Sequence, residues 1–284
     1  MRKLQVTMDQ AVADGADTVV TTGAPQSNHA RLTAAAGARL GLRVVLVLEG
    51  HEPERDRGKI LLGRLFGAEI VWAGARTAAE MADEVGADPA RGRVYRIPFG
   101  GSSPASAEVY VRAGAETLSQ VRDLQHLVVA VGSGGTMAGL VVALRAERVL
   151  GMDSGAVPDA TATVHGLLSA RRSGTEPSAG SLRIDREQVG EGYEQLAPRA
   201  AAALSLAART EGLVLPHLLR SGHGRPGGRR RVRGDQAWRA DRFPAHRRPG
   251  RAVRSRGLVT LPHWRLASSG IAFPCGGDAA VVRS

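Results

Sequence analysis

The feature that most constrains the fold is a regular alternation of apolar runs and helical stretches between Thr18 and Leu150. Runs such as DTVVTT, RVVLVLEG and HLVVAV alternate with segments of helical composition such as HARLTAAAGARLG. Strands that alternate with helices of about ten to fifteen residues indicate parallel βαβ units. Their continuous apolarity is typical of strands covered on both sheet faces. The pattern predicts an α/β fold of open parallel sheets with flanking helices.

Composition narrows the class of protein. The 284 residues are 43% hydrophobic, which is ordinary for a globular chain that buries a substantial core. No apolar run approaches the roughly 18 residues of a membrane span, and the N-terminus MRKLQVTMDQAVADG reads as an amphipathic helix without a secretion-signal core. The lone Cys275 excludes a disulfide framework within the chain and a cysteine zinc cluster. We therefore expect a cytoplasmic protein without membrane contact.

The formal net charge of +11 comes from the C-terminal part of the chain. Residues 216–284 hold 15 arginines, no lysine and 3 acidic residues, a net charge of +12, whereas residues 1–215 carry −1. Beyond Leu215 glycine, proline and arginine interrupt every apolar pattern, so an irregular tail is expected. A nucleic-acid-binding protein that uses this tail is the alternative function class, and we expect only non-specific, salt-dependent affinity for nucleic acid.

The middle of the chain is less regular. Residues 154–184 contain Pro158, Pro177 and several serines and glycines, and predict a loose segment. Helical periodicity returns afterwards, and Pro198 is suited to the first turn of a helix that ends near Arg209.

One candidate site is the glycine-rich segment VGSGGTMAGL, Val131–Leu140, which follows an apolar strand and opens a helix. Successive backbone N–H groups at such a turn can converge on an anion, and Ser133 and Thr136 add hydroxyl donors. A tight turn without a ligand remains an alternative. A dinucleotide fingerprint is another, because Gly132 and Gly134 match its first two glycines and Asp153 follows at a suitable distance.

The residue Met137 argues against that fingerprint. It occupies the third small position, where its side chain would crowd the helix against the strand. A single phosphate therefore suits this loop better than a pyrophosphate.

A second candidate site is the polar cluster Gln26-Ser27-Asn28-His29, which starts the Ala-rich helix. Ser27 is a plausible N-cap, and the cluster alone is consistent with helix capping, with His29 structural. Both this turn and the glycine-rich turn follow parallel strands, so both face the carboxyl side of a sheet, where ligands bind in open α/β folds. A third turn, PFGGSSPASA, adds glycines and hydroxyls at another strand end.

Four segments together resemble the D-cysteine desulfhydrase and 1-aminocyclopropane-1-carboxylate (ACC) deaminase family, whose members are fold-type-II enzymes dependent on pyridoxal 5′-phosphate and similar to tryptophan synthase β. The resemblance covers about residues 1–215 and implies a small α/β domain at 1–112, a partial larger domain at 113–215, and a homodimer. The segments are TTGAPQSNHARLTAAAGARLGLRVVLVLEG, IPFGGSSPASAEVYV, VVAVGSGGTMAGLVVAL and DREQVGEGYEQLAPRAAAALSLAARTEGLVL.

The resemblance also implies residue roles. Asn28 would hydrogen-bond the phenolic oxygen of the cofactor, and Ser27 would lie beside the substrate carboxylate or the proton-transfer centre. Gln26 and His29 would border the substrate. The expected reaction is β-elimination from D-cysteine, giving pyruvate, ammonia and sulfide, or ring-opening deamination of ACC, and the Ser-Asn-His sequence is closer to the desulfhydrase branch. The phosphate would be cradled by Gly132, Ser133, Gly134, Gly135 and Thr136.

The sequence departs from the family at two places. The family's Schiff-base lysine lies in a Gly-Gly-Asn-Lys-x-Arg-Lys-Leu motif, whose last four positions align with Met1-Arg2-Lys3-Leu4. That lysine would lie one residue before Met1, so the chain as written is expected to lack the covalent step and turnover. Lys3 matches the second, non-catalytic lysine of the motif, and Lys59 is expected on a distant helix.

The tail is the second departure. The family's Asp-Pro-x-Tyr-x-Gly-Lys segment and its closing Thr-Gly-Gly loop do not occur in residues 216–284. Read one base later with GC-rich codons, both ends of the tail can spell family-like segments. The hypothesis is that the tail is an out-of-frame translation, and the nucleotide sequence tests it.

Overall fold

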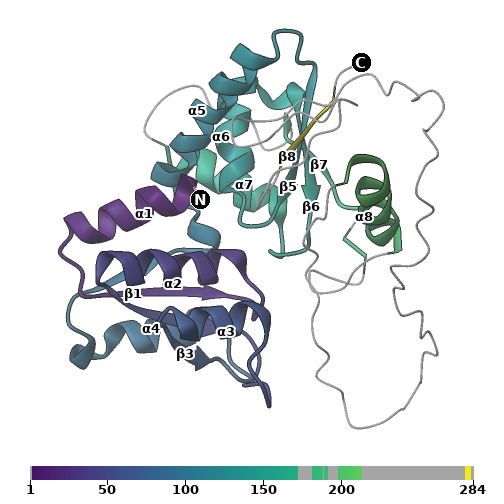
Figure 1. The fold of residues 1–284 in the computed structure, drawn as a ribbon. Coiled ribbons are helices and arrows are strands. Elements are labelled where there is room, and N and C mark those ends of the chain that lie inside the picture. The colour runs from purple at the N-terminus through teal and green to yellow at the C-terminus, as the bar shows by residue number, and fades with distance from the viewer. Residues whose placement is uncertain (1, 172–180, 188, 191–197, 213–278, 283–284) are drawn as a thin grey trace, which may run out of the picture.

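The computed structural model describes residues 2–171, 181–187, 189–190, 198–212 and 279–282. Two four-stranded sheets organise these residues, each with its own covering helices (Figure 1). Cys275 and nearly all of the Arg-rich tail lie outside the described residues, so the expectations for them are not tested.

The first sheet is entirely parallel and has the strand order β3-β2-β1-β4. Its register runs from Thr18 opposite Arg43 to Gly23 opposite Leu48. The central strand is almost wholly buried, as its continuous apolar and β-branched sequence predicts. The strands are β1 (Thr18–Gly23), β2 (Arg43–Leu48), β3 (Glu69–Trp72) and β4 (Val94–Ile97).

Helices cover both faces of the first sheet. One hydrophobic cluster joins Ala30 and Ile60 to Leu46 of β2, so α2 and α3 share a face. Another joins Ala82 to Val45 and Val47, which places α4 on the opposite face. The helices are α1 (Arg2–Ala13), α2 (Asn28–Leu40), α3 (Gly58–Leu65) and α4 (Ala78–Ala87), with a 3-10 turn at Pro89–Arg91.

The second sheet has the order β7-β6-β5-β8 and is parallel except for the β5–β8 pair. The structure differs here from the expected irregular tail, because residues 279–282 form a strand. The two β-branched valines of AAVV favour a strand, which pairs with the edge of β5. The strands are β5 (His126–Val131), β6 (Val149–Asp153), β7 (Arg183–Asp185) and β8 (Ala279–Val282).

Close packing of α5 on α6 forms the core beside the second sheet. A β-carbon on Gly139 would overlap the carbonyl oxygen of Ala107, and one on Gly114 would overlap the side chain of Ala143. The two glycines therefore allow the helices to approach. The helices are α5 (Pro104–Gln120), α6 (Gly135–Leu144), α7 (Ala160–Ser169) and α8 (Pro198–Glu211), with 3-10 turns at Phe99–Gly101 and Ala146–Arg148.

The expectation of a loose segment at 154–184 is wrong for α7 and β7. Asp159 caps α7 by accepting a hydrogen bond from the backbone N–H of Ala162, and Val164 and Leu168 bury its inner face. The sequence did not predict this helix because its buried residues are few and the surrounding segment is rich in serine and glycine.

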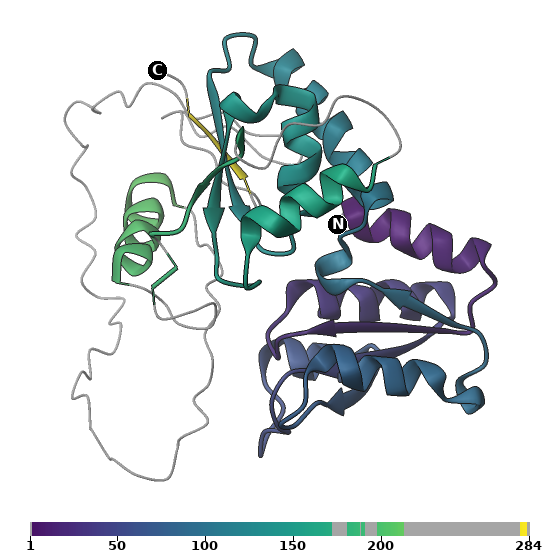
Figure 2. The same cartoon turned by 180° about the vertical axis from the view of Figure 1, so that it is seen from behind.

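Among the described residues, no helix is both long and apolar enough to cross a membrane. The division at residue 112 falls inside α5 and stays a proposal. Helix α1 lies between the first sheet and the helices of the second (Figures 1 and 2). Its Arg2 guanidinium forms two hydrogen bonds with the Glu116 carboxylate on α5, at 3.1 and 2.8 Å.

Candidate active site

The first turn of α1 brings an ammonium group to the glycine-rich turn. Lys3 Nζ donates to Ser102 Oγ at 3.0 Å and to Ser133 Oγ at 3.3 Å. Ser102 belongs to the turn after β4, and Ser133 to the turn after β5. Three segments far apart in the sequence therefore meet at one point.

The hydrogen bonds of this cluster leave one hydroxyl proton for a ligand. Ser102 Oγ accepts from Lys3 Nζ and from the Gly135 N–H at 3.2 Å, so both of its lone pairs are occupied. In its 2.8 Å contact with Ser133, Ser102 Oγ must therefore be the donor. The Ser133 hydroxyl accepts from Ser102 and Lys3, and its own proton has no acceptor among the described residues.

The backbone of the glycine-rich turn is shaped for an anion. Gly134 is the N-cap of α6, has a φ of 80°, and provides no side-chain cap. Thr136 Oγ1, one residue into the helix, is buried and has no hydrogen-bond partner in the described structure. A buried hydroxyl without a partner is costly, and a helix N-terminus favours negative charge. Together with the Lys3 ammonium, these donors fit a phosphate group.

The fit of Met137 corrects one expectation. The side chain was expected to crowd the helix against the strand, yet it is fully buried. A β-carbon on Gly151 of β6 would lie only 2.6 Å from Sδ of Met137. The absence of a side chain at Gly151 therefore makes the room that Met137 needs.

Helix α7 supports the glycine-rich turn from behind. A β-carbon on Gly134 would lie 3.2 Å from Cγ2 of Thr163 and 3.3 Å from Cδ1 of Leu167. Any bulk at Gly134 would therefore push the turn away from α7, in addition to the strain of its left-handed backbone.

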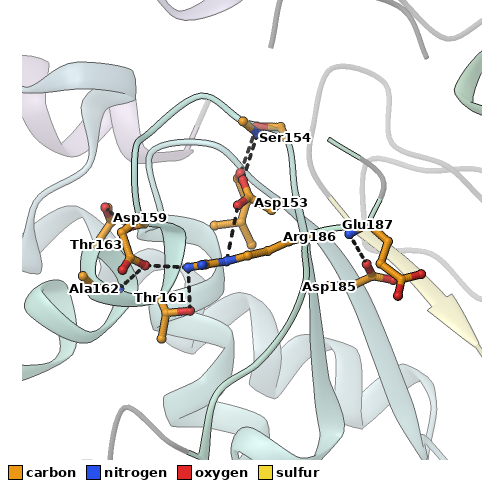
Figure 3. Close-up of polar contacts among 11 residues, drawn as sticks. Asp153, Ser154, Asp159, Thr161, Ala162, Thr163, Asp185, Arg186 and Glu187 are labelled. Carbon is orange, nitrogen blue, oxygen red and sulfur yellow. Dashed lines mark hydrogen bonds and ion pairs between the residues drawn. The ribbon is translucent and has the colours of Figure 1, made fainter. Parts of the chain in front are cut away.

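A polar cluster holds the start of α7 (Figure 3). Arg186, directly after β7, donates from Nη2 to Asp159 Oδ1 at 2.7 Å and to Thr161 Oγ1 at 3.4 Å. Its Nε lies 3.9 Å from Oδ2 of Asp153, the last residue of β6. Asp153 also accepts from the Gly155 N–H at 2.8 Å. The carboxylate that a dinucleotide fingerprint would use for a ribose hydroxyl therefore stabilises the loop after β6 instead.

The turn after β1 is anchored through its own polar side chains. Ser27 is the N-cap of α2, as predicted, and its Oγ accepts from the Ala30 N–H at 3.2 Å. Gln26 Oε1 accepts from the Lys59 N–H at 3.0 Å, and its Nε2 donates to the Arg57 carbonyl at 3.4 Å. Lys59 was expected on a distant helix, but Gln26 ties its backbone directly to this turn.

Asn28, the first residue of α2, has a different environment. Its side chain is half-buried and has no hydrogen-bond partner among the described residues. An amide in this position can donate to or accept from a bound molecule.

His29 is neutral and fixed in one tautomer. Thr21 Oγ1 donates to the Ile97 carbonyl at 3.2 Å, so in its 2.9 Å contact with His29 Nε2 it must accept. The proton of the imidazole therefore lies on Nε2. Burial, followed by the positive charges of Lys3 and the N-terminus, lowers the pKa of His29 from 6.5 to about 3.

The two predicted turns lie on the same side of the fold. A β-carbon on Gly101 would lie 3.1 Å from Cε1 of His29 and 3.8 Å from Cβ of Lys3. One on Gly100 would lie 2.7 Å from Cβ of Ser133. The turn after β4 thus touches both the Gln26–His29 turn and the glycine-rich turn.

Sequence reasoning missed Lys3 and Ser102 as members of this site. Lys3 was taken only as the second lysine of a motif, and Ser102 only as one hydroxyl of a third turn. The signal available was that this third turn also follows a parallel strand, so its hydroxyls reach the same sheet edge.

Comparisons with known proteins agree with this geometry. Residues 1–219 match the family described as "Pyridoxal-phosphate dependent enzyme". The chain is 36% identical over 232 residues to the D-cysteine desulfhydrase of Klebsiella pneumoniae (strain 342), covering 76% of this chain and 71% of that protein. It is 34% identical over 241 residues to the ACC deaminase of Methylobacterium nodulans, covering 75% and 71%.

A solved structure extends the comparison to three dimensions. The crystal structure of an ACC deaminase homologue superimposes with a TM-score of 0.65 at 30% identity, covering 76% of this chain and 70% of that one. The chain belongs to the family of pyridoxal-phosphate-dependent enzymes. Its fold is the α/β fold type II of that family, and pyridoxal 5′-phosphate is its cofactor rather than a dinucleotide.

Proposed function

We propose that this protein is a pyridoxal-phosphate-dependent lyase or deaminase of the D-cysteine desulfhydrase and ACC deaminase type. The similarity to enzymes with these two names supports the reaction class. The observation that carries the proposal is the convergence of the Lys3 ammonium, the unused Ser133 proton and the unpartnered Thr136 hydroxyl at the start of α6.

The phosphate of the cofactor would be held at this point. Gly134 gives the turn its left-handed backbone, and a side chain at Gly135 would collide with Ser102. Lys3, outside the turn, would balance the phosphate charge. The predicted cradle of Gly132, Ser133, Gly134, Gly135 and Thr136 therefore gains one member, Lys3. Ser102, whose hydroxyl is engaged by Lys3, Gly135 and Ser133, supports the cradle from outside.

Asn28 and Ser27 would act at the reactive end. When bound, pyridoxal phosphate withdraws electrons from the substrate Cα, which acidifies the Cα proton and favours loss of a β-substituent. The Asn28 amide would hold the phenolic oxygen. The Ser27 hydroxyl, whose oxygen accepts from the Ala30 N–H, would donate its proton to the substrate carboxylate. Gln26 and His29 would position this turn, Gln26 through α3 and His29 through β1 and β4.

The preference for D-cysteine over ACC, a homodimer and a cytoplasmic location remain parts of this proposal. The Ser27-Asn28-His29 sequence supports the desulfhydrase branch. Neither the position before Met1 nor residues 213–278 lie within the described structure, so no role is assigned there.

Binding experiments test the proposal independently of turnover. The 284-residue chain is titrated with pyridoxal phosphate by calorimetry, and its thermal unfolding is then measured with ligands. We expect S-methyl-D-cysteine, which has no free thiol to react with the cofactor, to raise the Tm of the loaded chain more than S-methyl-L-cysteine does. Comparison with ACC then ranks the two branches. Equal stabilisation by both enantiomers would refute the proposed stereospecific amino-acid site.

A further inference from the structure

The end of β1 contacts the start of α2 at two places. Successive residues of a strand point to opposite faces of its sheet, so Thr21 and Gly23 share one face and Thr22 lies on the other. Thr21 contacts His29, and Gly23 lies against Ser27. The shared face is therefore the one that supports the first turn of α2.

The first contact is a close approach between Gly23 and Ser27. A β-carbon on Gly23 would lie 2.9 Å from Cβ and 3.0 Å from Oγ of Ser27. Gly23 itself is fixed in the sheet, because it pairs with Leu48 of β2 and its carbonyl accepts from the Glu49 N–H at 3.1 Å. A side chain at position 23 would therefore displace Ser27 rather than the strand.

The second contact is a chain of hydrogen bonds from His29 to β4. The buried Thr21 hydroxyl accepts from His29 Nε2 at 2.9 Å and donates to the Ile97 carbonyl at 3.2 Å. The orientation of the imidazole is therefore set by β1 and β4 together. A valine at position 21 would have nearly the same shape but would leave the Nε2–H group of His29 without this acceptor.

Asn28 lies between these two fixed residues. Its own side chain is half-buried and has no hydrogen-bond partner among the described residues. Its backbone is nevertheless restrained on both sides, at Ser27 by the contact with Gly23 and at His29 by the contact with Thr21. An amide restrained in this way can bind a ligand at a smaller ordering cost, which is the physical basis of preorganisation.

We propose that Thr21 and Gly23 are positioning residues, which together hold the Asn28 amide toward the pyridoxal ring. The inference rests on the proposed function where it names the ligand of Asn28, whereas the support of the turn by β1 does not depend on a ligand. The phosphate cradle is held by other contacts, those of Lys3 and Ser102 with the glycine-rich turn. Loss of either positioning residue should therefore weaken binding of the cofactor's ring and leave phosphate binding unchanged.

Two ligands separate a positioning role from a general loss of structure. The affinities of the full chain for pyridoxal phosphate and for inorganic phosphate are measured by calorimetry in the wild type, Thr21→Val, Thr21→Ser, Gly23→Ala and Thr22→Val. We expect pyridoxal phosphate to bind about tenfold more weakly to Thr21→Val and Gly23→Ala, with phosphate affinity unchanged, because only the contact to the ring loses its preorganisation.

Two of these variants are controls. Thr21→Ser keeps the hydroxyl and should retain most of the affinity for pyridoxal phosphate. Thr22→Val is the same substitution on the opposite face of β1, where the half-buried Thr22 side chain makes no hydrogen bond within the described part of the chain. Its two affinities should equal those of the wild type.

The tautomer of His29 gives a second readout that needs no ligand. Long-range proton–nitrogen NMR correlations should place the imidazole proton on Nε2 in the wild type and in Thr21→Ser, and this single tautomer should be lost in Thr21→Val. An unchanged tautomer in Thr21→Val, or a parallel loss of both affinities in Thr21→Val and Gly23→Ala, would overturn the inference. A wild type that binds pyridoxal phosphate no more tightly than phosphate contradicts the proposed function, and the tautomer alone then decides whether Thr21 holds the turn.

Discussion

The ammonium of Lys3 lies 3.3 Å from Oγ of Ser133, although 130 positions separate the two residues. One belongs to the first turn of α1 and the other to the turn after β5. This contact places a positive charge at the glycine-rich turn before any ligand is bound.

The contact predicts a selective loss of anion affinity. Lys3→Gln should weaken the binding of both phosphate and pyridoxal phosphate by about tenfold or more, because a charge-assisted donor is removed. Lys3→Arg keeps the charge and should retain part of the affinity. Calorimetry at two salt concentrations measures the effect, and the difference between wild type and Lys3→Gln should shrink at high salt. Equal affinities in Lys3→Gln and wild type would remove Lys3 from the site.

His29 predicts a pH dependence of stability. Its pKa is lowered from 6.5 to about 3 in the folded chain, so the unfolded chain binds the proton more readily in this interval. The free energy of unfolding should therefore fall as the pH decreases from about 6.5 towards 3, with His29 contributing a slope of up to about 1.4 kcal/mol per pH unit. Above pH 6.5 this contribution is constant.

Urea unfolding of His29→Gln across this range measures the contribution. The variant should have a shallower dependence than the wild type. Identical slopes for His29→Gln and wild type would mean that the imidazole is not buried as a neutral group.

Helix packing predicts that replacing two different glycines by alanine changes the stability of the protein in opposite directions. Gly139→Ala should destabilise the protein by roughly 1–3 kcal/mol, because the new methyl group would overlap the Ala107 carbonyl. Gly166→Ala, exposed on α7 with no atom near its β-carbon position, should stabilise it by about 0.5–1 kcal/mol. Urea unfolding distinguishes the two, and destabilisation by both would indicate a general intolerance of the helices.

The cap of α7 predicts a difference between two substitutions of Asp159. Asp159→Ala removes both the acceptor for the Ala162 N–H and the partner of Arg186, so the Tm should fall. Asp159→Asn keeps an acceptor oxygen and should lose less. Because α7 supports Gly134, the larger loss should be accompanied by weaker phosphate binding, measured by calorimetry. Unchanged phosphate affinity in Asp159→Ala would mean that the turn holds its shape without this cap.

The sequence predicted the elements around the site better than the contacts between them. The alternation of apolar runs and helices is a local property, so β1, α2, β5 and α6 were predicted close to their observed bounds. The Ser27 cap was predictable for the same reason. Lys3 was not assigned to the site, since its approach depends on how α1 packs against residues about a hundred positions away.

Two further differences between the sequence predictions and the structure have physical causes. Helix α7 was missed because its buried positions are few and lie among small polar residues. The missing side chain at Gly151 makes room for the large side chain of Met137. A single motif cannot predict this fit, because Met137 lies on a helix and Gly151 on the neighbouring strand. Sequence patterns report on one element at a time, whereas both features depend on pairs of elements.

Helix α1 connects the two sheets of the protein. Its Arg2 binds Glu116 of α5, and its Lys3 binds the turns after β4 and β5. Its Leu4 and Met8 pack with Val19 of the first sheet. Occupation of the glycine-rich turn would therefore restrain both halves of the protein at once. When pyridoxal phosphate binds, the amide protons of α1, α2 and α5 should all exchange with solvent more slowly. The three helices should respond as a single cooperative unit.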